Sequence, residues 1–525
     1  MGADHTHINP ACRVLVVGAG PVGLAMASEL ARLGVGVRIV DKTAARSDRS
    51  KALVLWTRTL ELMRIMGCVD AFLGIGLHAT HASLRSGARE LVRLGFDRLD
   101  SPYPFGLLLP QSETERLLEA HLNEHGVEVE RETELTGFEA DASGVTSTLR
   151  HADGHEERLR SDWLVGCDGA HSTVRHALGF EFEGEAEPND WLLADIHLQG
   201  FDRDDEVTIF LHRIGVLALF PMGGGRFRVI ADRGPRREDP GATVAPTLED
   251  VQDVLDVRGP GSLRAGNPVW LTYFGINERK VRDYRAGRVL LAGDAAHIHS
   301  PAGGQGMNTG LQDACNLSWK LALVCRGAAT AASPLLASYS PERSAVAAHV
   351  LSGAAALTRM GTMRNPLLQG LRNFILPLAM RLPALRRTIV TMLGELDIAY
   401  RDSLLSRRAP GAGSAGLQAG ERVVDQPVRL LDGTSAGLYE RLRSGRFLVL
   451  AGREDAESEQ AAELLGRFGD ACDLAVDDVA ESGIRAIRPD GYLGLVADAH
   501  DWKAVAGYLE DLLASAGSVG HANAG

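Results

Sequence analysis

The feature that most constrains this chain is a glycine-rich turn between a short apolar strand and a helix. Residues 13–17 read RVLVV, a run suited to a strand, and residues 18–23 read GAGPVG. Small and apolar residues then recur at helical spacing from Pro21 to Leu33, and a second apolar run spans Val37–Val40. This order predicts two parallel strands joined by a helix in a right-handed crossover.

Each glycine of this turn has its own task in a dinucleotide site. Gly18 makes the tight turn, Gly20 lets the backbone approach a pyrophosphate at the helix N-terminus, and Gly23 lets the helix pack on the strand. Asp41 ends the second strand, where it can accept hydrogen bonds from a ribose. The motif predicts an adenine dinucleotide, NAD or FAD, with a purely structural turn as the alternative. The cofactor-binding residues predicted here are Gly18, Gly20, Pro21, Val22, Gly23, Asp41 and Lys42.

Two further carboxylates follow apolar strands. Asp168 precedes Gly169 in DWLVGCDGAHSTVR, and Asp294 follows Gly293 in VLLAGDAAHIHSPAGGQGMNTG. Open α/β sheets bind ligands outside the carboxyl ends of their strands, so both aspartates are predicted to lie at one ligand-binding edge. Two ordinary strand-to-loop aspartates remain the alternative.

The composition and the pattern of apolar runs change along the chain. From about 188 to 280, the runs EVTIFL, VLALF and RFRVIAD predict a sheet-rich domain inserted between two parts of the first domain. Residues 310–400 are rich in Ala and Leu and predict helices. After a linker at 407–422, a new alternation of strands and helices runs to Leu513, which predicts a separate α/β domain.

Composition and charge exclude several classes of function. The 525 residues carry 55 Lys and Arg against 68 Asp and Glu, a net charge of −13, without a block of basic residues that would follow a phosphate backbone. Nucleic acid is therefore not expected as a partner. The six cysteines form no CxxC pair and no cluster at metal-ligand spacing, so neither disulfides nor a metal site is predicted. This usage fits a reducing cytoplasm, the expected location.

The segment 371–393 is the most membrane-like, but four arginines and two prolines interrupt it. It predicts broken helices and no membrane span, with an amphipathic surface helix or an oligomer contact as the alternative. The first ten residues carry no basic n-region, so no export signal is predicted. A homodimer is left open.

With these motifs, residues 13–405 resemble the single-component flavoprotein aromatic hydroxylases, the group that includes para-hydroxybenzoate and phenol hydroxylases. The resemblance implies bound FAD, transient NADPH or NADH, and O2. It also implies that the glycine loop and Asp41 hold the ADP half of FAD. Asp168 with Arg175 would serve FAD and NAD(P)H, and Asp294 would reach the ribityl chain.

The same resemblance implies further contacts with FAD. Gln111 stands at the family position that bonds the ribityl-phosphate region, and Lys51 stands where the family commonly has an arginine by the phosphates. The alternatives are an exposed helix N-terminus for Gln111 and a solvated surface lysine for Lys51. The cofactor-binding residues implied beyond the glycine turn are Lys51, Gln111, Asp168, Asp294, Pro301, Gly304, Gly306, Met307 and Asn308.

The glycine-rich loop after Asp294 would let the backbone lie against the flat isoalloxazine ring. A helix starting near Asn308 would point its positive end, with the backbone amides of Met307 and Asn308, at the pyrimidine edge of the ring. For His297 and His299, structural hydrogen bonds are favoured over acid–base roles. No second GxGxxG follows a strand, so NAD(P)H is expected to lack a nucleotide domain of its own.

Residues 415–517 resemble the thioredoxin-like C-terminal domain of phenol, pentachlorophenol and aromatic-polyketide hydroxylases, through AGERVVDQPVRL, GRFLVLAG and AIRPDGYLGLV. Because Cys472 is alone, a structural or oligomer-supporting role is expected. The implied fold class is α/β: a Rossmann-like FAD-binding domain, an inserted mainly-β substrate domain, a helical segment and a thioredoxin-like α/β domain. The expected boundaries are 11–187 and 281–405 for the FAD-binding domain with its helical segment, 188–280 for the substrate domain and 415–517 for the last domain.

The implied function is NAD(P)H-dependent hydroxylation of a phenolic or polycyclic aromatic substrate, such as a polyketide, through a flavin hydroperoxide. No side chain needs to act as a nucleophile, and no catalytic residue is assigned. The substrate pocket is expected between the sheet domain and the flavin. Candidates for its lining are Trp56, Tyr103, His212, Phe220 and Tyr273, with core packing as the commoner role. The alternatives are a Baeyer–Villiger or epoxidising monooxygenase, an oxygen-independent flavin reductase, and a non-catalytic flavin-binding protein.

Overall fold

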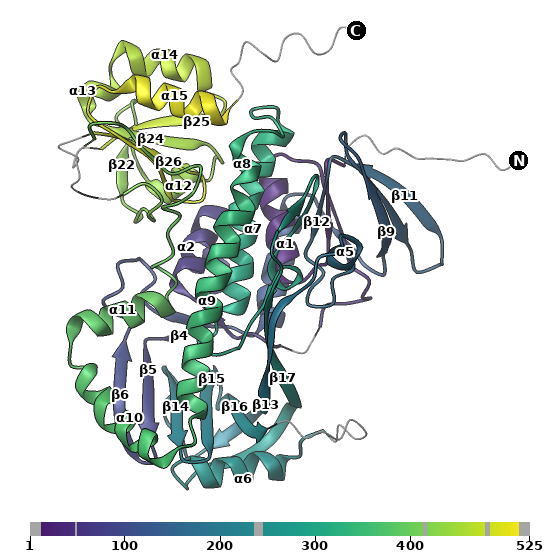
Figure 1. Cartoon of the computed structure of the whole chain (residues 1–525), viewed down its shortest axis with the longest axis vertical. Coiled ribbons are helices and arrows are strands. Elements are labelled where there is room, and N and C mark those ends of the chain that lie inside the picture. Colours follow the sequence, from purple (N-terminus) through teal and green to yellow (C-terminus); the bar gives the residue numbers. More distant parts are fainter. Residues whose placement is uncertain are drawn as a thin grey trace, which may run out of the picture.

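The computed structural model describes residues 12–47, 50–235, 245–412, 416, 418–477 and 483–513. Figure 1 shows a central body around α1 and α7, a large sheet at one end of the molecule and a smaller α/β unit at the other end.

The central body is built on a six-stranded sheet with the order β18-β19-β12-β1-β2-β8. Its strands are β1 (Val14–Val17), β2 (Val37–Val40), β8 (Val129–Glu130), β12 (Trp163–Gly166), β18 (Arg285–Ala286) and β19 (Val289–Leu291). All neighbours pair in parallel except β18 and β19. The predicted strand, helix and parallel strand at the start of the chain are therefore confirmed.

The register of this sheet brings four strand ends to one level. Val17 of β1 lies beside Val40 of β2 and Gly166 of β12. Gly166 in turn lies beside Leu291 of β19. The chain leaves β1 for β2 on one side and continues later in β12 on the other side, which makes a topological switch point, the usual place for a ligand in such sheets.

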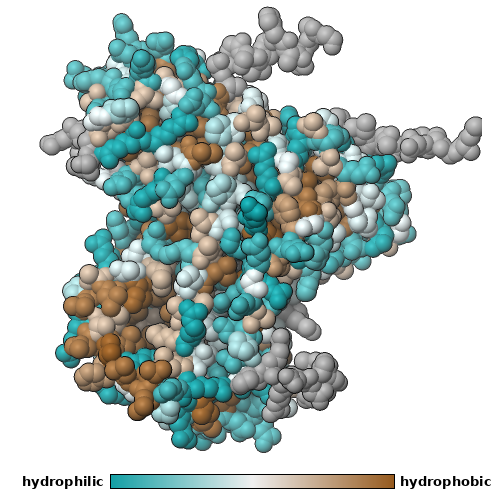
Figure 2. All heavy atoms as spheres, viewed as in Figure 1, coloured by the Kyte–Doolittle hydropathy of each residue, from teal (hydrophilic) through white to brown (hydrophobic). Residues whose placement is uncertain are grey.

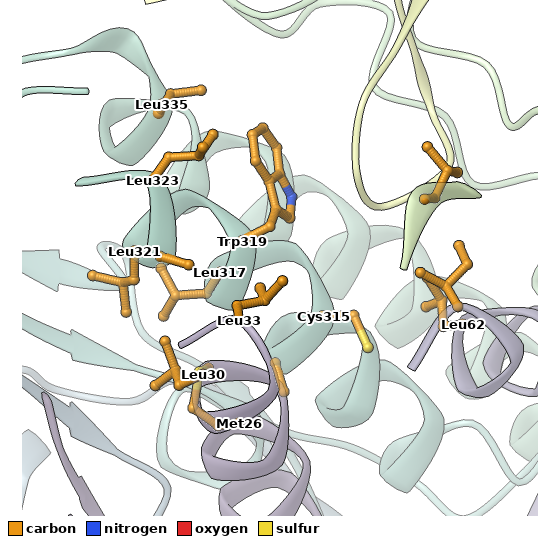
Figure 3. Close-up of a cluster of buried hydrophobic side chains, with 14 of the residues drawn as sticks. Met26, Leu30, Leu33, Leu62, Cys315, Leu317, Trp319, Leu321, Leu323 and Leu335 are labelled. Atoms are coloured by element: carbon orange, nitrogen blue, oxygen red, sulfur yellow. The ribbon is translucent and has the colours of Figure 1, made fainter. Parts of the chain in front are cut away.

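Helices α1 (Pro21–Arg32) and α7 (Gly306–Cys325) pack against each other beside this sheet. In Figure 3, Met26 and Leu30 of α1 lie close to Leu317 of α7, and all three side chains are buried. Full burial of one such side chain is worth about 1.5–3 kcal/mol, so this contact fixes α7 firmly. The other helices of the central body are α2 (Thr57–Met66), α3 (Val69–Leu73), α4 (Gln111–Glu124), α5 (Thr173–Ala177) and the 3-10 turn Gly293–Ala295.

Two three-stranded sheets flank the central body. One has the order β11-β10-β9 and the other β3-β7-β4. Their strands are β9 (Glu134–Ala140), β10 (Val145–Arg150), β11 (Glu156–Ser161), β3 (Val54–Leu55), β4 (Leu77–Ala79) and β7 (Gly106–Leu108).

The large sheet has eight strands in the order β20-β17-β13-β16-β15-β14-β5-β6. They are β5 (His81–Ser86), β6 (Arg89–Gly95), β13 (Glu183–Gln199), β14 (Glu206–His212), β15 (Gly215–Gly223), β16 (Arg226–Pro235), β17 (Arg264–Lys280) and β20 (His297–Ile298). The strands predicted within 188–280 are present, but β5, β6 and β20 join them from outside that range. The link is the parallel pairing of β14 with β5, which no local pattern encodes.

The two faces of the large sheet are covered differently. Helix α6 (Leu248–Arg258) packs on one face, where Val251 and Leu255 join a buried cluster with Leu217 of β15. The opposite face carries Trp191 and Phe274 and belongs to a second cluster, which includes residues of α10 and α11.

The helical segment contains α7, α8 (Pro334–Ala337), α9 (Tyr339–Thr362), α10 (Pro366–Ala379) and α11 (Pro383–Leu393). The broken helices predicted in 371–393 are confirmed, because α10 ends at Ala379 and Pro383 opens α11. Pro377 lies inside α10, in its last turn. No helix in the described part of the chain is long and apolar enough to cross a bilayer.

The C-terminal unit is a seven-stranded sheet with the order β21-β27-β26-β24-β25-β22-β23. The strands are β21 (Arg407–Arg408), β22 (Pro427–Arg429), β23 (Ser435–Gly437), β24 (Phe447–Ala451), β25 (Cys472–Val476), β26 (Ile484–Ile487) and β27 (Leu493–Ala497). The helices are α12 (Leu438–Leu442), α13 (Arg453–Ala456), α14 (Glu459–Phe468) and α15 (Trp502–Leu512).

A parallel pair, β24 and β25, joins an antiparallel run of β24, β26 and β27, as expected for a thioredoxin-like domain. Cys472 is buried, without a disulfide. Residues 407–422 are not wholly a linker: Arg407–Arg408 pair with β27 as an edge strand. Two charged residues without alternation give no strand signal, which explains the difference.

Candidate active site

The glycine turn and three aspartates meet at the level strand ends of the central sheet. Gly18 follows β1, Asp41 follows β2, Asp168 comes two residues after β12, and Asp294 lies in the turn after β19. Because neighbouring strands lie about 4.8 Å apart, these groups share one edge, as the sequence predicted.

The glycine turn leaves open space only where a ligand would approach. Gly18 has φ +100°, and a Cβ there would overlap the carbonyl oxygen of Cys167. A Cβ at Gly23 would overlap the carbonyl oxygen of Gly18, whereas a Cβ at Gly20 would meet no protein atom within 4 Å. The N-terminus of α1, with Pro21 in its first turn, has no side-chain cap. Its free backbone N–H groups therefore suit an anion.

Val22 locks this turn to the strand end that carries Asp294. A Cβ added to Gly293 or to Gly310 of α7 would come within 3 Å of the Val22 side chain. Val22 thus fills the space between α1, α7 and the turn after β19.

Asp41 is tied to the glycine turn itself. Its Oδ2 accepts a hydrogen bond from the backbone N–H of Ala19 at 2.7 Å, and its Oδ1 accepts from the backbone and the hydroxyl of Thr43. The half-buried carboxylate braces the turn and keeps an accessible side for a ribose. Lys42 is exposed beside it.

Asp168 has one satisfied oxygen and one without a partner. Its Oδ2 accepts from the backbone N–H of Val174 at 3.2 Å, while Oδ1 is buried without a hydrogen bond in the described structure. A buried carboxylate oxygen is costly to leave unpaired, so Oδ1 is a position for a ligand donor. Arg175 is buried, lies over the Phe182 ring at 3.8 Å and has a pKa lowered by burial, with Asp168 opposing that effect.

Asp294 is exposed to solvent. Desolvation by the surrounding protein nevertheless raises the pKa of its carboxyl, and the charges of His297 and Lys51 oppose the rise. Lys51 is exposed, and its backbone carbonyl accepts a hydrogen bond from Arg228 at 2.9 Å. The lysine thus contributes a positive charge to the side of the site that holds Asp294.

The loop from Pro301 to Gln305 leads into α7, which starts at Gly306, two residues before the predicted start at Asn308. Pro301 is exposed, and the loop turns through a hydrogen bond from the N–H of Gly304 to the carbonyl of Pro301. Helix α7 has no side-chain cap, so the amides near Met307 remain available at its positive end.

Asn308 works through its side chain, which sequence reasoning did not foresee. Its Nδ2 donates to the carbonyls of Val54 and Gly304, both at 2.9 Å, and its Oδ1 accepts from the N–H of Trp56. The Trp56 indole also donates to the carbonyl of Gly303 at 2.7 Å. These bonds hold β3 against the loop and fix the start of α7.

Gln111 begins α4 and holds the segment around Ala52. Its Oε1 accepts from the N–H of Ala52, and its Nε2 donates to Glu115 at 2.9 Å. The pKa of Glu115 is raised by burial and lowered in part by this bond. The hydrogen bond to Ala52 thus brings the amide close to the segment that carries Lys51, although the two are far apart in sequence. Its contact with a cofactor stays a prediction.

His297 and His299 both make structural hydrogen bonds, as favoured from the sequence. His297 Nε2 lies 2.7 Å from Oδ2 of Asp313, and His299 Nδ1 lies 2.9 Å from the carbonyl of Ser300. Burial lowers the pKa of His299 to about 4, so this imidazole is neutral near pH 7.

Asp313 of α7 is a site residue that the sequence analysis missed. It is fully buried and accepts hydrogen bonds from the N–H of Gly293 at 2.9 Å, from His297, and from Arg343 Nε at 2.5 Å. Burial favours a raised pKa, but Arg343 and His297 outweigh it and hold the pKa of Asp313 below its usual range. Its only sequence signal was a carboxylate within a largely buried helix that carries no other acidic residue.

The five aromatic and histidine candidates for the substrate pocket divide among three places. Trp56 and Phe220 belong to the cluster on the sheet face opposite α6. Tyr273 packs on the α6 face, and His212 has a pKa lowered by burial and by Arg258 of α6. Tyr103 lies in the core of the central body. Only the first two therefore lie where the pocket was expected.

The residues present fit FAD. Two helix N-termini without side-chain caps face one sheet edge, Gly20 leaves room for a pyrophosphate, and Asp168 offers an unpaired buried oxygen. Gly303 and Gly304, with φ +85° and +67°, leave the loop beside Trp56 without side chains at these two positions.

Comparison with known proteins agrees with this reading. A family model described as FAD binding domain matches residues 11–354, more than half of the chain. The chain is 36% identical over 525 residues to 6-methylpretetramide 4-monooxygenase from Streptomyces rimosus, covering 92% of this chain and 90% of the relative. It is 32% identical over 465 residues to pentachlorophenol 4-monooxygenase from Sphingobium chlorophenolicum, covering 86% and 82%.

Among solved structures, the anhydrotetracycline hydroxylase OxyS from Streptomyces rimosus matches with a TM-score of 0.76 and 31% identity, covering 94% of this chain and 98% of that one. The family and the fold agree with the resemblance read from the sequence. The chain therefore belongs to the FAD binding domain family and is an FAD-dependent monooxygenase of the aromatic hydroxylase type.

Proposed function

We propose that this monooxygenase uses NADPH or NADH and O2 to hydroxylate a phenolic or polycyclic aromatic substrate. The observation that carries the proposal is an apolar wall beside the predicted flavin surface. Trp191, Phe220 and Phe274 lie on the sheet face opposite α6, in one cluster with Trp56, whose indole bonds the loop before α7. The names of the relatives, which include a pentachlorophenol monooxygenase, support an aromatic substrate.

The cofactor-binding roles follow from the site. The glycine turn and the N-terminus of α1 would bind the pyrophosphate, Asp41 a ribose, and Asp294 the ribityl chain, with Gln111 and Lys51 near the phosphates. The N-terminus of α7 would stabilise negative charge on the pyrimidine edge. When bound, FAD would supply the oxygen chemistry through a flavin hydroperoxide, after reduction by NAD(P)H.

The chain itself would position the flavin ring and the substrate, and it would exclude water. Gly303 and Gly304 would let the ring lie flat, and the apolar wall would keep water from the reacting atoms. Trp191 is buried, and its indole N–H has no partner in the described structure, so it is a donor that a substrate oxygen could accept from. Asp168 and Arg175 would serve the approach of NAD(P)H.

Other parts of the proposal concern location and assembly. All six cysteines are free thiols, which supports a reducing cytoplasm. Whether the chain forms a homodimer is an open question that sedimentation would answer directly. Baeyer–Villiger or epoxidising chemistry on the same fold, and oxygen-independent reduction, remain the competing functions.

The decisive experiment is NAD(P)H oxidation by the FAD-loaded protein across a panel of phenols and aromatic polyketides, with product and hydrogen peroxide both quantified. We expect one substrate class to stimulate oxidation and to yield a product that carries one atom from labelled O2 on its ring. An ester or epoxide product would support the competing oxygenations. Equal turnover without O2 would refute the monooxygenase proposal.

A further inference from the structure

An apolar face on α10 is exposed to solvent. In the described structure, thirteen large hydrophobic side chains are exposed, and seven of them lie on α10 or directly after it. Figure 2 shows this region as a hydrophobic area over the lower left of the molecule, where Figure 1 places α10 and α11. We call these residues the α10 face: Leu367, Leu368, Leu371, Phe374, Ile375, Leu378 and Leu382.

The α10 face is one continuous stripe. Leu367, Leu371, Phe374 and Leu378 follow the spacing that places residues on one side of a helix. Leu367 is 85% exposed and Phe374 73% exposed. Monomeric soluble proteins rarely leave more than about 300–600 Å² of contiguous apolar surface uncovered, and such surfaces usually bind something.

Two polar side chains of α10 are hydrogen-bonded to the rest of the protein. Gln369 is buried and donates to the carbonyls of Arg213 and Met363, and Arg372 donates to the carbonyl of Met360 at 2.7 Å. These bonds fix the rotation of the helix. These hydrogen bonds would be lost if the helix rotated about its axis. They therefore keep the α10 face exposed.

The charged residues near the α10 face indicate what kind of partner would bind there. No acidic residue lies between Glu342 and Glu395, in a chain whose net charge is −13. Seven arginines lie there; of these, Arg343 is buried in its pair with Asp313 and Arg364 lies 3.7 Å from Asp232, so neither counts toward the face. Arg381 and Arg387 are exposed close to the face, one directly after α10 and one on α11. A basic amphipathic helix with leucine and phenylalanine on its apolar side is typical of attachment to an anionic membrane surface.

A second copy of the chain fits this surface less well. A twofold pairing through the α10 face would bring the same arginines together, without acidic residues in this segment to match them. We propose that the α10 face and its flanking arginines seat the protein on an anionic lipid surface, with the leucines and Phe374 among the acyl chains and the arginines at the headgroups.

The helix that carries the α10 face also packs against the apolar cluster of the proposed substrate site. Leu376 of α10 and Leu385 and Ile389 of α11 contact the same cluster that contains Trp191 and Phe220. Lipid attachment would place the apolar wall beside the membrane, from which an apolar aromatic could be taken up. This second step rests on the proposed function, whereas the attachment itself does not.

The test is flotation of the FAD-loaded full chain with vesicles of phosphatidylcholine alone or mixed with phosphatidylglycerol. We expect binding to the mixed vesicles only, weakened by salt. Leu371→Gln/Phe374→Gln should reduce binding at least about tenfold. Arg381→Gln/Arg387→Gln should reduce it by about fivefold per arginine. Leu431→Gln, at a leucine 51% exposed in the C-terminal unit, is the matched control and should bind like the parent.

Three outcomes would overturn the proposal. The parent could fail to bind either vesicle, or the control could lose as much binding as the α10 variant. Sedimentation could also show a dimer that Leu371→Gln/Phe374→Gln converts to a monomer, which would make the α10 face an interface between copies. NAD(P)H oxidation in vesicle-free solution should be the same in parent and variant, so that a failure of the proposed chemistry is recognised separately.

Discussion

Replacing Asp313 by Asn tests whether a buried carboxylate holds the flavin edge together. Three N–H donors converge on Asp313, from Gly293, His297 and Arg343. Asparagine has nearly the same shape but offers one oxygen and one NH2 group. Whichever way the amide turns, its NH2 must face the guanidinium of Arg343 or the N–H of Gly293, so one donor loses its acceptor.

The size of the effect follows from the buried charge that remains. Arg343 is fully buried, and without Asp313 its partners are the Tyr400 hydroxyl and the carbonyl of Thr309, which carry no charge. Removing one partner of a buried ion pair costs about 3–5 kcal/mol. Because domains are commonly stable by about 5–15 kcal/mol, Asp313→Asn should remain folded but clearly destabilised.

The pH dependence has a defined sign. Since the pKa of Asp313 is lower in the folded than in the unfolded chain, its contribution is present above the unfolded value near about 3.9 and is lost as pH falls through the folded pKa. The difference between the parent and Asp313→Asn should therefore be full at neutral pH and shrink below about pH 4.

The assay combines urea unfolding, followed by tryptophan fluorescence, with FAD titration of the folded apoprotein. Glu457→Gln is the control, because its pair with Arg453 is exposed at 3.2 Å and is worth at most about 1 kcal/mol. Loss of the bond to Gly293 should also weaken FAD binding by up to about tenfold. If Asp313→Asn matches the parent in both stability and FAD affinity, the role assigned to Asp313 is wrong.

Four further outcomes are expected. Gly20→Val should fold but lose FAD affinity at least about tenfold. Gly23→Val should not fold, because a Cβ at Gly23 overlaps the backbone of Gly18, whereas a Cβ at Gly20 meets no protein atom. Equal circular dichroism spectra and FAD titrations for the two variants would contradict this. Gly304→Val, at φ +67°, should abolish FAD binding or flavin reduction, and a fully active variant would show that the ring lies elsewhere. Because burial lowers the pKa of His299 to about 4, the unfolded chain binds more protons between that value and about 6.5, and stability falls as pH falls through this window. His299→Gln should flatten that fall in urea midpoints; an unchanged slope would assign it to other groups. Trp191→Phe should raise the KM of the aromatic substrate about fivefold with little change in kcat, and an unchanged KM would remove Trp191 from substrate binding.

The strand ends could be read from sequence because their signals are local. An apolar β-branched run that stops at glycine and aspartate encodes a strand and its ligand edge within a few residues, as at Gly18 and Gly293. The pairing of β14 with β5 could not be read in this way. It joins Thr208 to Ser83 across more than a hundred residues, and neither strand carries a sign of its partner.

The pocket candidates show a second limit of sequence-based prediction. Alternation along a strand does not say which face of the sheet each set of side chains lies on. Tyr273 and Phe274 are neighbours in β17 and face opposite sides of the sheet. The alternation gives two sets of side chains, but only the packing of α6 on one face decides which set meets the flavin side. Sequence reasoning therefore selected Tyr273 and passed over Phe274 and Trp191.

The buried charges explain how a C-terminal unit whose sequence has no CxxC pair can support the flavin site. Arg488 of that unit bonds both oxygens of Glu342 in α9, at 2.7 and 3.0 Å, and Glu342 also accepts from Lys320 of α7. The next residue of α9, Arg343, is the partner of Asp313 nearer the start of α7. Two adjacent residues of α9 thus tie α7 to the C-terminal unit on one side and to the turn that contains Asp294 on the other. Because each of these ions would be costly to bury alone, the unit is a fixed part of the frame that positions α7.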